Sequence, residues 1–337
     1  MKEILYVGEN MYGSNSLQRM NALKRIGNTV EGIDFTNKFH KNSLKGIYSR
    51  VLKKFSYGID LTYCNDTIFK RINSKKYDIL WIDKGLTIKP DIIEYAKKNN
   101  RVKYVIGYYN DDMFQKFNQT KQWLQGLPLY DLSVTTKSFN VNELLLMGAK
   151  NVELVTNGYD PTVHRPKKVS KQDKKKFGGD IGFVGAWEKE RLISMLALAN
   201  SGLQVKWWGG EFSGKKFSSN SQNLIYKSNT IWGDDYSTAL NSFKISLCFL
   251  RKINRDLQTC RTMEIPACAG FMLAERTIEH LELFEESKEA EFFSDTDELI
   301  DKTKFYLSNS SIRKKIALAG RERCEKSNYS YDSIVLS

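Results

Sequence analysis

The chain of 337 residues is 41% hydrophobic, 27% charged and 12% aromatic, a composition typical of globular proteins and not of disordered ones. Because this length exceeds what one hydrophobic core usually supports, two domains of about 160 residues are expected. No signal peptide precedes the first apolar run, and no run approaches the roughly 18 apolar residues of a membrane span, so we expect a cytoplasmic protein. The five cysteines are widely spaced without any C-x-x-C, which indicates neither a disulfide framework nor a zinc site.

The first half alternates short apolar runs with helical patterns. It opens with a strand at residues 4–8, a loop, and a helix over 16–26 that ends at Gly27. The alternation continues with strands at 29–35, 77–85, 102–112, 131–138 and 152–158, and with helices at 90–100 and 139–150. Strands and helices at this spacing predict a parallel, doubly wound sheet.

A polar, lysine-rich stretch then separates the halves, and a second alternating series follows. This series has strands at 180–187, 203–210, 244–250, 271–275 and 290–293, and helices at 188–202, 235–243, 294–308 and 311–326. The sequence therefore predicts an α/β protein of two Rossmann-like, doubly wound parallel sheets facing a central cleft. The predicted parts are a domain over 1–165, a linker over 166–178, a domain over 179–325, and a tail over 326–337 that packs back on the first domain.

The net charge of +13 is uneven along the chain. Residues 37–103 carry 16 basic and 6 acidic side chains, a net of +10. This segment either attracts an anionic partner, such as a lipid surface, an anionic polymer or nucleic acid, or is a solvated lysine-rich surface.

Several familiar motifs are missing. The chain has no G-x-G-x-x-G, no P-loop pattern and no G-x-S-x-G, which argues against nicotinamide, ATP and serine-hydrolase chemistry. Asp295-Thr296-Asp297 follows a strand and opens a helix, so we interpret it as a helix cap. The three histidines, His40, His164 and His280, are expected on the surface and not in a metal site.

In the first half, polar residues follow several predicted strands, at the edge where ligands of such sheets bind. Gly13, Ser14 and Asn15 suit close approach of a ligand or a simple helix cap. Asp83 ends another strand. The neighbouring Asp111 and Asp112 could accept a proton from a substrate or cap the next helix.

The most informative stretch is RTMEIPACAG, residues 261–270. Pro266 suits the first turn of a helix, which places the start of a short helix near Thr262. Amides at that helix start, together with Arg261, would bind a diphosphate. Glu264 in the same turn suits the two hydroxyls of a ribose, although both charged residues could instead be structural.

Three stretches of the second half resemble the CgeB-like (spore-maturation-protein-like) glycosyltransferases, which have the two-Rossmann GT-B fold. They are RTMEIPACAGFMLAERTIEHLELF, EAEFFSDTDELIDKTKFYL and SIRKKIALAGRERC. The resemblance covers most of residues 180–330. In the first half only TNGYDPTVHRP is similar, to the crossing between the domains of such enzymes.

The resemblance implies roles for particular residues. Asp256 and Glu264, with seven residues between them, are similar to the acidic pair of retaining family 4 enzymes, although Asp256 stands where that pattern has Glu. By this likeness Glu264 contacts the nucleotide ribose and Asp256 the donor sugar. We add Gly185 and Trp187 to the expected donor-binding residues, and Arg261 is the expected stabiliser of the departing diphosphate.

The sequence is thus interpreted as a metal-independent glycosyltransferase that uses a UDP- or GDP-linked sugar, with its donor in the second domain. The acceptor would be a glycan, a lipid-linked molecule or a protein held by the first domain, with peripheral association at the inner face of an anionic membrane. Asp111 or Asp112 would be the base of an inverting reaction, whereas a retaining reaction, which we favour, needs none. A non-catalytic nucleotide-sugar or nucleic-acid binder and a two-Rossmann epimerase are the alternatives.

Overall fold

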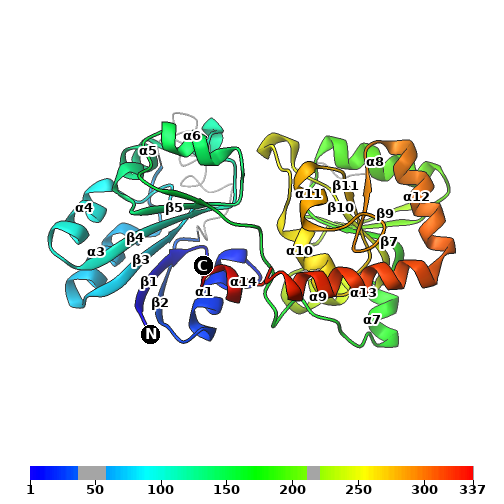
Figure 1. Cartoon of the computed structure of the whole chain (residues 1–337), viewed down its shortest axis with the longest axis horizontal. Coiled ribbons are helices and arrows are strands. Elements are labelled where there is room, and N and C mark those ends of the chain that lie inside the picture. The colour runs from blue at the N-terminus through cyan, green and yellow to red at the C-terminus, as the bar shows by residue number, and fades with distance from the viewer. Residues whose placement is uncertain (37–57, 211–220, 337) are drawn as a thin grey trace. The chain divides into compact units, whose positions relative to one another are not determined.

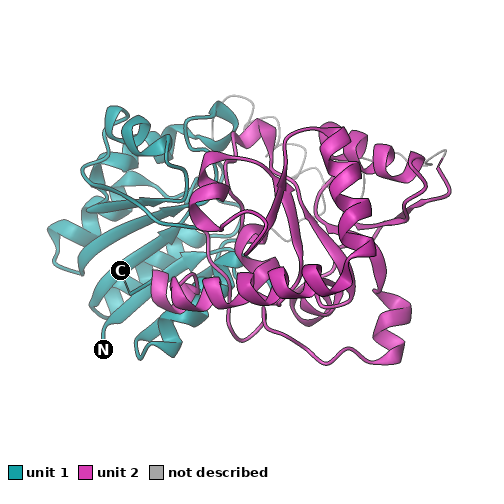
Figure 2. Cartoon of the chain, turned by 45° about the vertical axis from the view of Figure 1, so that its right-hand side comes forward, with its two compact units in different colours: residues 1–156, 335–337 teal, residues 157–334 magenta. Residues whose placement is uncertain are grey.

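The structure is a computed structural model that describes residues 1–36, 58–210 and 221–336. It divides into two compact units, unit 1 being Met1–Thr156 with Val335–Ser337 and unit 2 being Asn157–Ile334 (Figure 2). The division falls earlier than the predicted boundary at residue 165. The predicted linker holds a helix, α7 (Lys171–Lys176), whose first turn is fixed by reciprocal bonds between Ser170 and Asp173.

Unit 1 is built on a parallel sheet with the strand order β2-β1-β3-β4-β5-β6 (Figure 1). Its strands are β1 (Glu3–Gly8), β2 (Thr29–Asp34), β3 (Tyr77–Asp83), β4 (Val102–Tyr109), β5 (Leu132–Thr135) and β6 (Val152–Leu154). Its helices are α1 (Asn15–Arg25), α3 (Cys64–Ser74), α4 (Pro90–Lys98), α5 (Lys121–Gly126) and α6 (Asn140–Leu146).

Both faces of the unit 1 sheet are apolar. In β1, Ile4 and Tyr6 belong to the cluster that α1 covers, whereas Leu5 and Val7 belong to the cluster that α3 and α4 cover. A strand buried on both faces reads as a continuous apolar run, which explains why ILYV does not alternate with polar residues. Val335 near the end of the chain also packs against the first cluster.

Unit 2 repeats the plan, with the strand order β12-β11-β10-β7-β8-β9 and parallel pairing throughout. Its strands are β7 (Gly179–Val184), β8 (Val205–Trp208), β9 (Leu224–Lys227), β10 (Phe243–Cys248), β11 (Met272–Glu275) and β12 (Glu291–Phe293). Besides α7, its helices are α8 (Lys189–Asn200), α9 (Gly233–Leu240), α10 (Cys260–Ala267), α11 (Ile278–Leu283), α12 (Thr296–Ser308), α13 (Ser310–Lys326) and α14 (Tyr331–Ile334). The predicted fold of two Rossmann-like sheets is confirmed.

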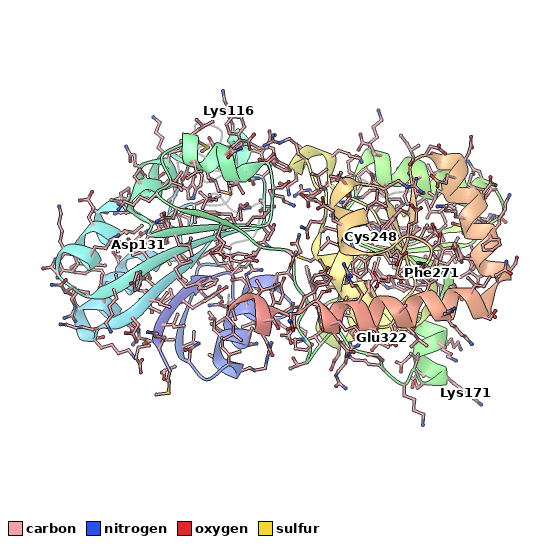
Figure 3. The ribbon with its side chains drawn as sticks, in the orientation of Figure 1. Lys116, Asp131, Lys171, Cys248, Phe271 and Glu322 are labelled. Carbon is pink, nitrogen blue, oxygen red and sulfur yellow. The ribbon has the colours of Figure 1, made fainter. Side chains whose placement is uncertain are left out.

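In unit 2, as in unit 1, successive side chains of a strand pack on opposite faces of the sheet. Phe183 and Trp207 pack with α8, whereas the next residues along their strands, Val184 and Trp208, pack with α9 and α10. Cys248 is buried at the end of β10, while Glu322 on α13 is exposed (Figure 3). The buried apolar positions fix the strand register, so the residues that follow the strands are held in defined places.

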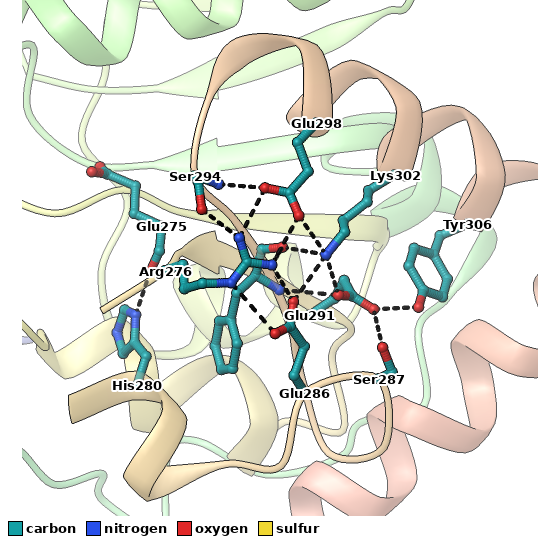
Figure 4. A network of polar contacts seen from close by, with 11 residues as sticks. Glu275, Arg276, His280, Glu286, Ser287, Glu291, Ser294, Glu298, Lys302 and Tyr306 are labelled. Atoms are coloured by element: carbon teal, nitrogen blue, oxygen red, sulfur yellow. Dashed lines mark hydrogen bonds and ion pairs between the residues drawn. The ribbon is translucent and has the colours of Figure 1, made fainter. Parts of the chain in front are cut away.

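A network of charged side chains ties the end of β11 to α12 (Figure 4). Arg276 binds Glu286 and Glu298, and Lys302 lies 2.7 Å from Glu291 and 2.9 Å from Glu286. Because Glu291 is only 1% exposed, the nearby ammonium offsets the cost of burying its carboxylate. Hydrogen bonds from Arg276 hold the pKa of Glu298 well below its usual range. Asp295 caps α12 by accepting from the Glu298 amide, as predicted.

None of the described helices is both long enough and apolar enough to cross a membrane. The predicted basic segment spans residues 37–103, and its first part, residues 37–57, lies outside the described residues. In its described part, Arg71 lies 2.8 Å from Glu31 and Lys75 lies 2.9 Å from Glu3, so part of this positive charge is paired within unit 1.

Candidate active site

The candidate donor site of unit 2 lies where the order of its strands reverses. The chain runs from β7 outward to β8 and β9, and then returns to β10 on the other side of β7. The loops that follow β7 and β10 therefore leave the sheet in different directions, and ligands of open parallel sheets bind at such a point. The first loop contains Gly185 and Trp187, and the second leads into α10.

Helix α10 begins slightly earlier than predicted. Its first residue is Cys260 and not Thr262, because the Thr259 amide donates to the Thr262 hydroxyl at 3.0 Å and caps the first turn. Pro266 consequently lies inside the helix, where it leaves the Thr262 carbonyl without its usual amide donor. This earlier start places Arg261 and Glu264, three residues apart, on the same side of α10.

Arg261 is a half-buried guanidinium that makes only long contacts. It donates to the carbonyls of Val184 at 3.4 Å and Phe249 at 3.5 Å, and it lies 5.5 Å from the Phe183 ring. Its Nε atom is buried with no hydrogen-bond partner among the described residues, and none of their carboxylates lies within 4.0 Å of it. A guanidinium with spare donors between two loops at a switch point is suited to binding an oxyanion.

Gly185 keeps this position open. A Cβ atom added there would lie 2.7 Å from the Phe183 ring and 3.3 Å from Nη1 of Arg261. Only glycine therefore allows the loop to pass so close to the guanidinium. Trp187, two residues further along, is 36% exposed.

Arg191 on α8 is a second guanidinium of this site, and it was not among the residues predicted from the sequence. It is 4% exposed and donates to the carbonyls of Ala186 at 3.1 Å and Leu250 at 3.4 Å, so it joins the loops after β7 and β10. Burial and the charge of Arg261 lower its pKa to about 10. Arg191 lies four residues before the buried Met195, on the apolar face of α8. An arginine at such a position in the sequence is the pattern that could have identified it.

Glu264 lies deeper along α10 and is 5% exposed. Its Oε2 atom accepts a hydrogen bond of 2.6 Å from the Tyr236 hydroxyl on α9. Its Oε1 atom lies 3.8 Å from Nε2 of His164. The Glu264 carboxylate is thus held by the Tyr236 hydroxyl and lies near His164. It belongs to a residue three positions after Arg261, whose guanidinium carries the positive charge.

Asp256 is placed differently from Glu264. Its carboxylate accepts from the Asn254 amide group at 2.8 Å and from the Arg251 backbone at 3.3 Å, so it orders the loop between β10 and α10. Arg255 in this loop has a φ of 47°, a left-handed conformation that turns the chain beside Asp256.

In unit 1, the residues predicted at the ends of the strands have partners within the unit. Ser14 is the N-cap of α1 and accepts from the Leu17 amide at 3.1 Å, which fits the simpler of the two interpretations. Gly13 has a φ of 82°, and Asn15 is the first helical residue.

The three aspartates of unit 1 differ in exposure. Asp83 is 5% exposed and lies 2.6 Å from Arg19, so it forms a buried ion pair. Asp112 is completely buried and accepts from the Asn140 amide group at 2.9 Å. Asp111 is partly exposed and forms an ion pair with Lys84. Of the neighbouring pair, only Asp111 has a carboxylate that solvent reaches.

The surface positions predicted for two histidines are wrong. His164 is 1% exposed and His280 is 0% exposed, because each packs its ring against an aromatic neighbour and binds local polar groups. His280 lies 2.6 Å from the Glu275 carbonyl and 2.9 Å from the Thr262 hydroxyl, which ties it to the first turn of α10. Burial lowers its pKa to about 4. His40 lies outside the described residues.

Comparisons with known proteins agree with this architecture. Residues 189–336 match the family described as glycosyl transferase-like. No curated protein matches the chain. The described part of the chain holds no cluster of three or more His, Cys, Asp or Glu residues that could bind a metal ion.

Solved structures similar to the chain share little sequence with it. HepE from Anabaena in complex with UDP-glucose is 12% identical, with a TM-score of 0.65 over 99% of this chain and 97% of that chain. The sucrose-phosphate synthase of Thermosynechococcus elongatus is 12% identical, with a TM-score of 0.65 over 100% and 97%. A putative UDP-N-acetylglucosamine 2-epimerase from Listeria monocytogenes is 11% identical, with a TM-score of 0.55 over 100% and 95%.

These likenesses define a class. The chain has the GT-B fold of two Rossmann-like domains. More particularly, residues 189–336 match the glycosyl transferase-like family, and this stretch contains α10 with Arg261 and Glu264.

The buried His280 predicts a pH-dependent stability. Unfolded histidine has a pKa of about 6.5, whereas His280 in the folded protein has a pKa of about 4. Between these values the unfolded chain binds a proton that the folded chain does not, so up to about 3 kcal/mol of stability is lost as the pH falls from 6.5 to 4. Urea unfolding of wild type and His280→Asn at pH 8, 6 and 4.5 should show a smaller loss in the variant. An unchanged dependence on pH would contradict this assignment.

Proposed function

We propose that this protein is a glycosyltransferase that transfers a sugar from a nucleotide-sugar to an acceptor hydroxyl. The observation that carries the proposal is the placement of Arg261 and Glu264 on one side of α10, at the switch point of the unit 2 sheet. A cation suits the diphosphate and an anion suits the ribose diol, so the pair matches a nucleotide-sugar. The family match over residues 189–336 supports the same reaction.

The donor is proposed to be UDP-linked, with a GDP-linked sugar as the alternative. HepE was crystallised with UDP-glucose, and its fold is shared by this chain. In our proposal Arg261, the start of α10 and the loop of Gly185 and Trp187 hold the diphosphate, and Asp256 contacts the sugar. Negative charge grows on the diphosphate as it leaves, and the guanidinium stabilises that charge without a metal ion.

The acceptor is assigned to unit 1, which carries Gly13, Ser14, Asn15 and Asp83 at the same edge of its sheet. For an inverting reaction the solvent-accessible Asp111 is a better base than the buried Asp112. The spacing of Asp256 and Glu264 favours retention, which needs no protein base. We further propose that the chain is CgeB-like and acts in the synthesis of a surface glycan, glycolipid or glycoprotein.

The epimerase alternative is supported by the fold shared with the putative Listeria enzyme. Incubation with UDP-sugars distinguishes the candidates, because an epimerase converts the sugar without an acceptor, a transferase releases UDP, and a binding protein does neither. Release of UDP that increases with added acceptor supports the proposal. Interconversion of the free UDP-sugar would overturn it.

The first functional prediction concerns Glu264. In Glu264→Gln a neutral amide replaces a charged acceptor, and hydrogen bonds to charged groups contribute about 1.5 to 3 kcal/mol. UDP should therefore bind about 10- to 100-fold more weakly, as measured by calorimetry. The exposed Glu282→Gln on α11 is the matched control and should bind UDP like wild type. Wild-type affinity in folded Glu264→Gln would refute the ribose contact.

The second functional prediction concerns Arg261. Its guanidinium should matter most as the diphosphate departs, so Arg261→Ala should lose more in kcat than in donor binding. Removing one such donor typically costs about 10²- to 10³-fold in turnover. Steady-state rates and donor affinity, measured on the same preparation, test this. Equal losses in both quantities would indicate simple ground-state binding.

The last functional prediction concerns the basic segment, which we propose to attract an anionic membrane or polysaccharide. Lys70 and Lys76 are exposed, and no described carboxylate lies within ion-pair distance of them. Wild type should pellet with anionic vesicles at low salt and less at high salt. Neutralising Lys70, Arg71, Lys75 and Lys76 together should abolish pelleting while UDP binding persists.

Two exposed lysines of α7, Lys174 and Lys175, supply the matched control for this experiment. Their replacement by Gln removes positive charge from unit 2 and should leave vesicle binding nearly unchanged. Equal and negligible pelleting of wild type with neutral and anionic vesicles at both salt concentrations would identify the segment as a solvated surface.

A further inference from the structure

The Glu264 carboxylate has two neutral neighbours that belong to other elements. The Tyr236 hydroxyl, from α9, donates to Oε2 at 2.6 Å. Nε2 of His164 faces Oε1 at 3.8 Å, and the His164 ring lies edge-on to the Tyr236 ring, 5.7 Å between centroids. His164 is 1% exposed, so both groups act on the carboxylate from inside unit 2.

The surroundings of His164 determine which of its nitrogens carries the proton. The Asp160 amide donates to Nδ1 at 3.1 Å, so Nδ1 is an acceptor and Nε2 bears the hydrogen of the neutral ring. This Nε2 atom lies 3.8 Å from Oε1 of Glu264, so the nearest charged group to the ring nitrogen is that carboxylate. The backbone amide of His164 donates in turn to the Asp160 carbonyl at 2.8 Å, which fixes the backbone that carries the imidazole ring.

Neutral donors orient a carboxylate without neutralising its charge. A lysine or arginine in the place of His164 would form an ion pair with Glu264 and weaken it as an acceptor. Burial keeps the pKa of Tyr236 well above its ordinary value and that of His164 below its own, so both remain neutral near pH 7. A carboxylate has about four lone-pair sites, and the hydrogen bond from Tyr236 occupies one of them, which leaves room for a ligand's hydroxyls.

We propose that Tyr236 and His164 are positioning residues that hold the Glu264 carboxylate in the orientation that binds a ribose diol, and that they thereby set the preference for ribonucleotides over deoxyribonucleotides. This inference rests on the proposed function. Tyr236 and His164 do not contact the ligand in this proposal, because each acts through Glu264.

The test compares UDP with 2′-deoxy-UDP in one calorimetric series. Wild type should bind UDP at least tenfold more tightly than 2′-deoxy-UDP. Tyr236→Phe and His164→Ala should reduce this ratio severalfold, because UDP loses two contacts with Glu264 whereas 2′-deoxy-UDP has only its 3′-hydroxyl to lose. His164→Gln, which returns an N–H near the position of Nε2, should restore most of the ratio.

Tyr329→Phe is the matched control, because Tyr329 is also buried in unit 2 and its hydroxyl donates to the Leu283 carbonyl at 3.2 Å. It should keep the wild-type ratio. Circular dichroism of every variant, together with an affinity for 2′-deoxy-UDP that falls less than the affinity for UDP, separates loss of positioning from loss of folding.

The outcomes distinguish this inference from the proposed function. If Glu264→Gln abolishes the ribose preference but Tyr236→Phe and His164→Ala keep it, the positioning role is overturned and the proposed function stands. If wild type shows no preference, or does not bind UDP, the assignment of Glu264 to the ribose fails and this inference fails with it.

Discussion

Two guanidinium groups held beside one phenyl ring are the arrangement on which the candidate site depends. Arg191 is buried, Arg261 is half-buried, and both lie within 6 Å of the Phe183 ring centroid. Burial, and secondly the charge of Arg261, lower the pKa of Arg191, and the Glu188 carboxylate 4.0 Å away partly offsets this effect. Among the described residues, the hydrogen-bond partners of Arg261 are two backbone carbonyls at 3.4 and 3.5 Å, so its guanidinium keeps donors that an oxyanion could accept from.

The parallel sheet brings the residues of this arrangement together although they are far apart in the sequence. All strands of unit 2 end at one edge, so residues from β7, α8 and α10, far apart along the chain, meet at the switch point. The first turn of α10 is fixed by its cap and by His280, and its second turn carries Glu264. Rigid elements of this kind place opposite charges at defined positions, which a mobile loop would not do.

Apolar periodicity predicted the two-sheet fold and most strands because their runs are continuous and well bounded. It missed β9, a four-residue edge strand, and α3, whose polar face hides its apolar spacing. The position of Arg261 and Glu264 near the start of a helix after β10 was predictable, because Pro266 suits a helix's first turn and a strand precedes the loop. Arg191, His164 and Tyr236 were not, because their partners lie tens of residues away and only packing brings them together. Composition alone suggests exposed histidines, yet burial of both rings is possible because local carbonyl, amide and hydroxyl groups satisfy them.

The return of the chain's end to unit 1 has a consequence for how the protein is made. Val335 packs against the cluster formed by β1, β3, β4 and α1, and Val335–Ser337 belong to unit 1 although unit 2 occupies the intervening sequence. During synthesis the first 156 residues can begin to collapse as they leave the ribosome. The apolar surface that receives Val335 nevertheless stays uncovered until the whole of unit 2 has been translated, so unit 1 starts folding first and is completed last.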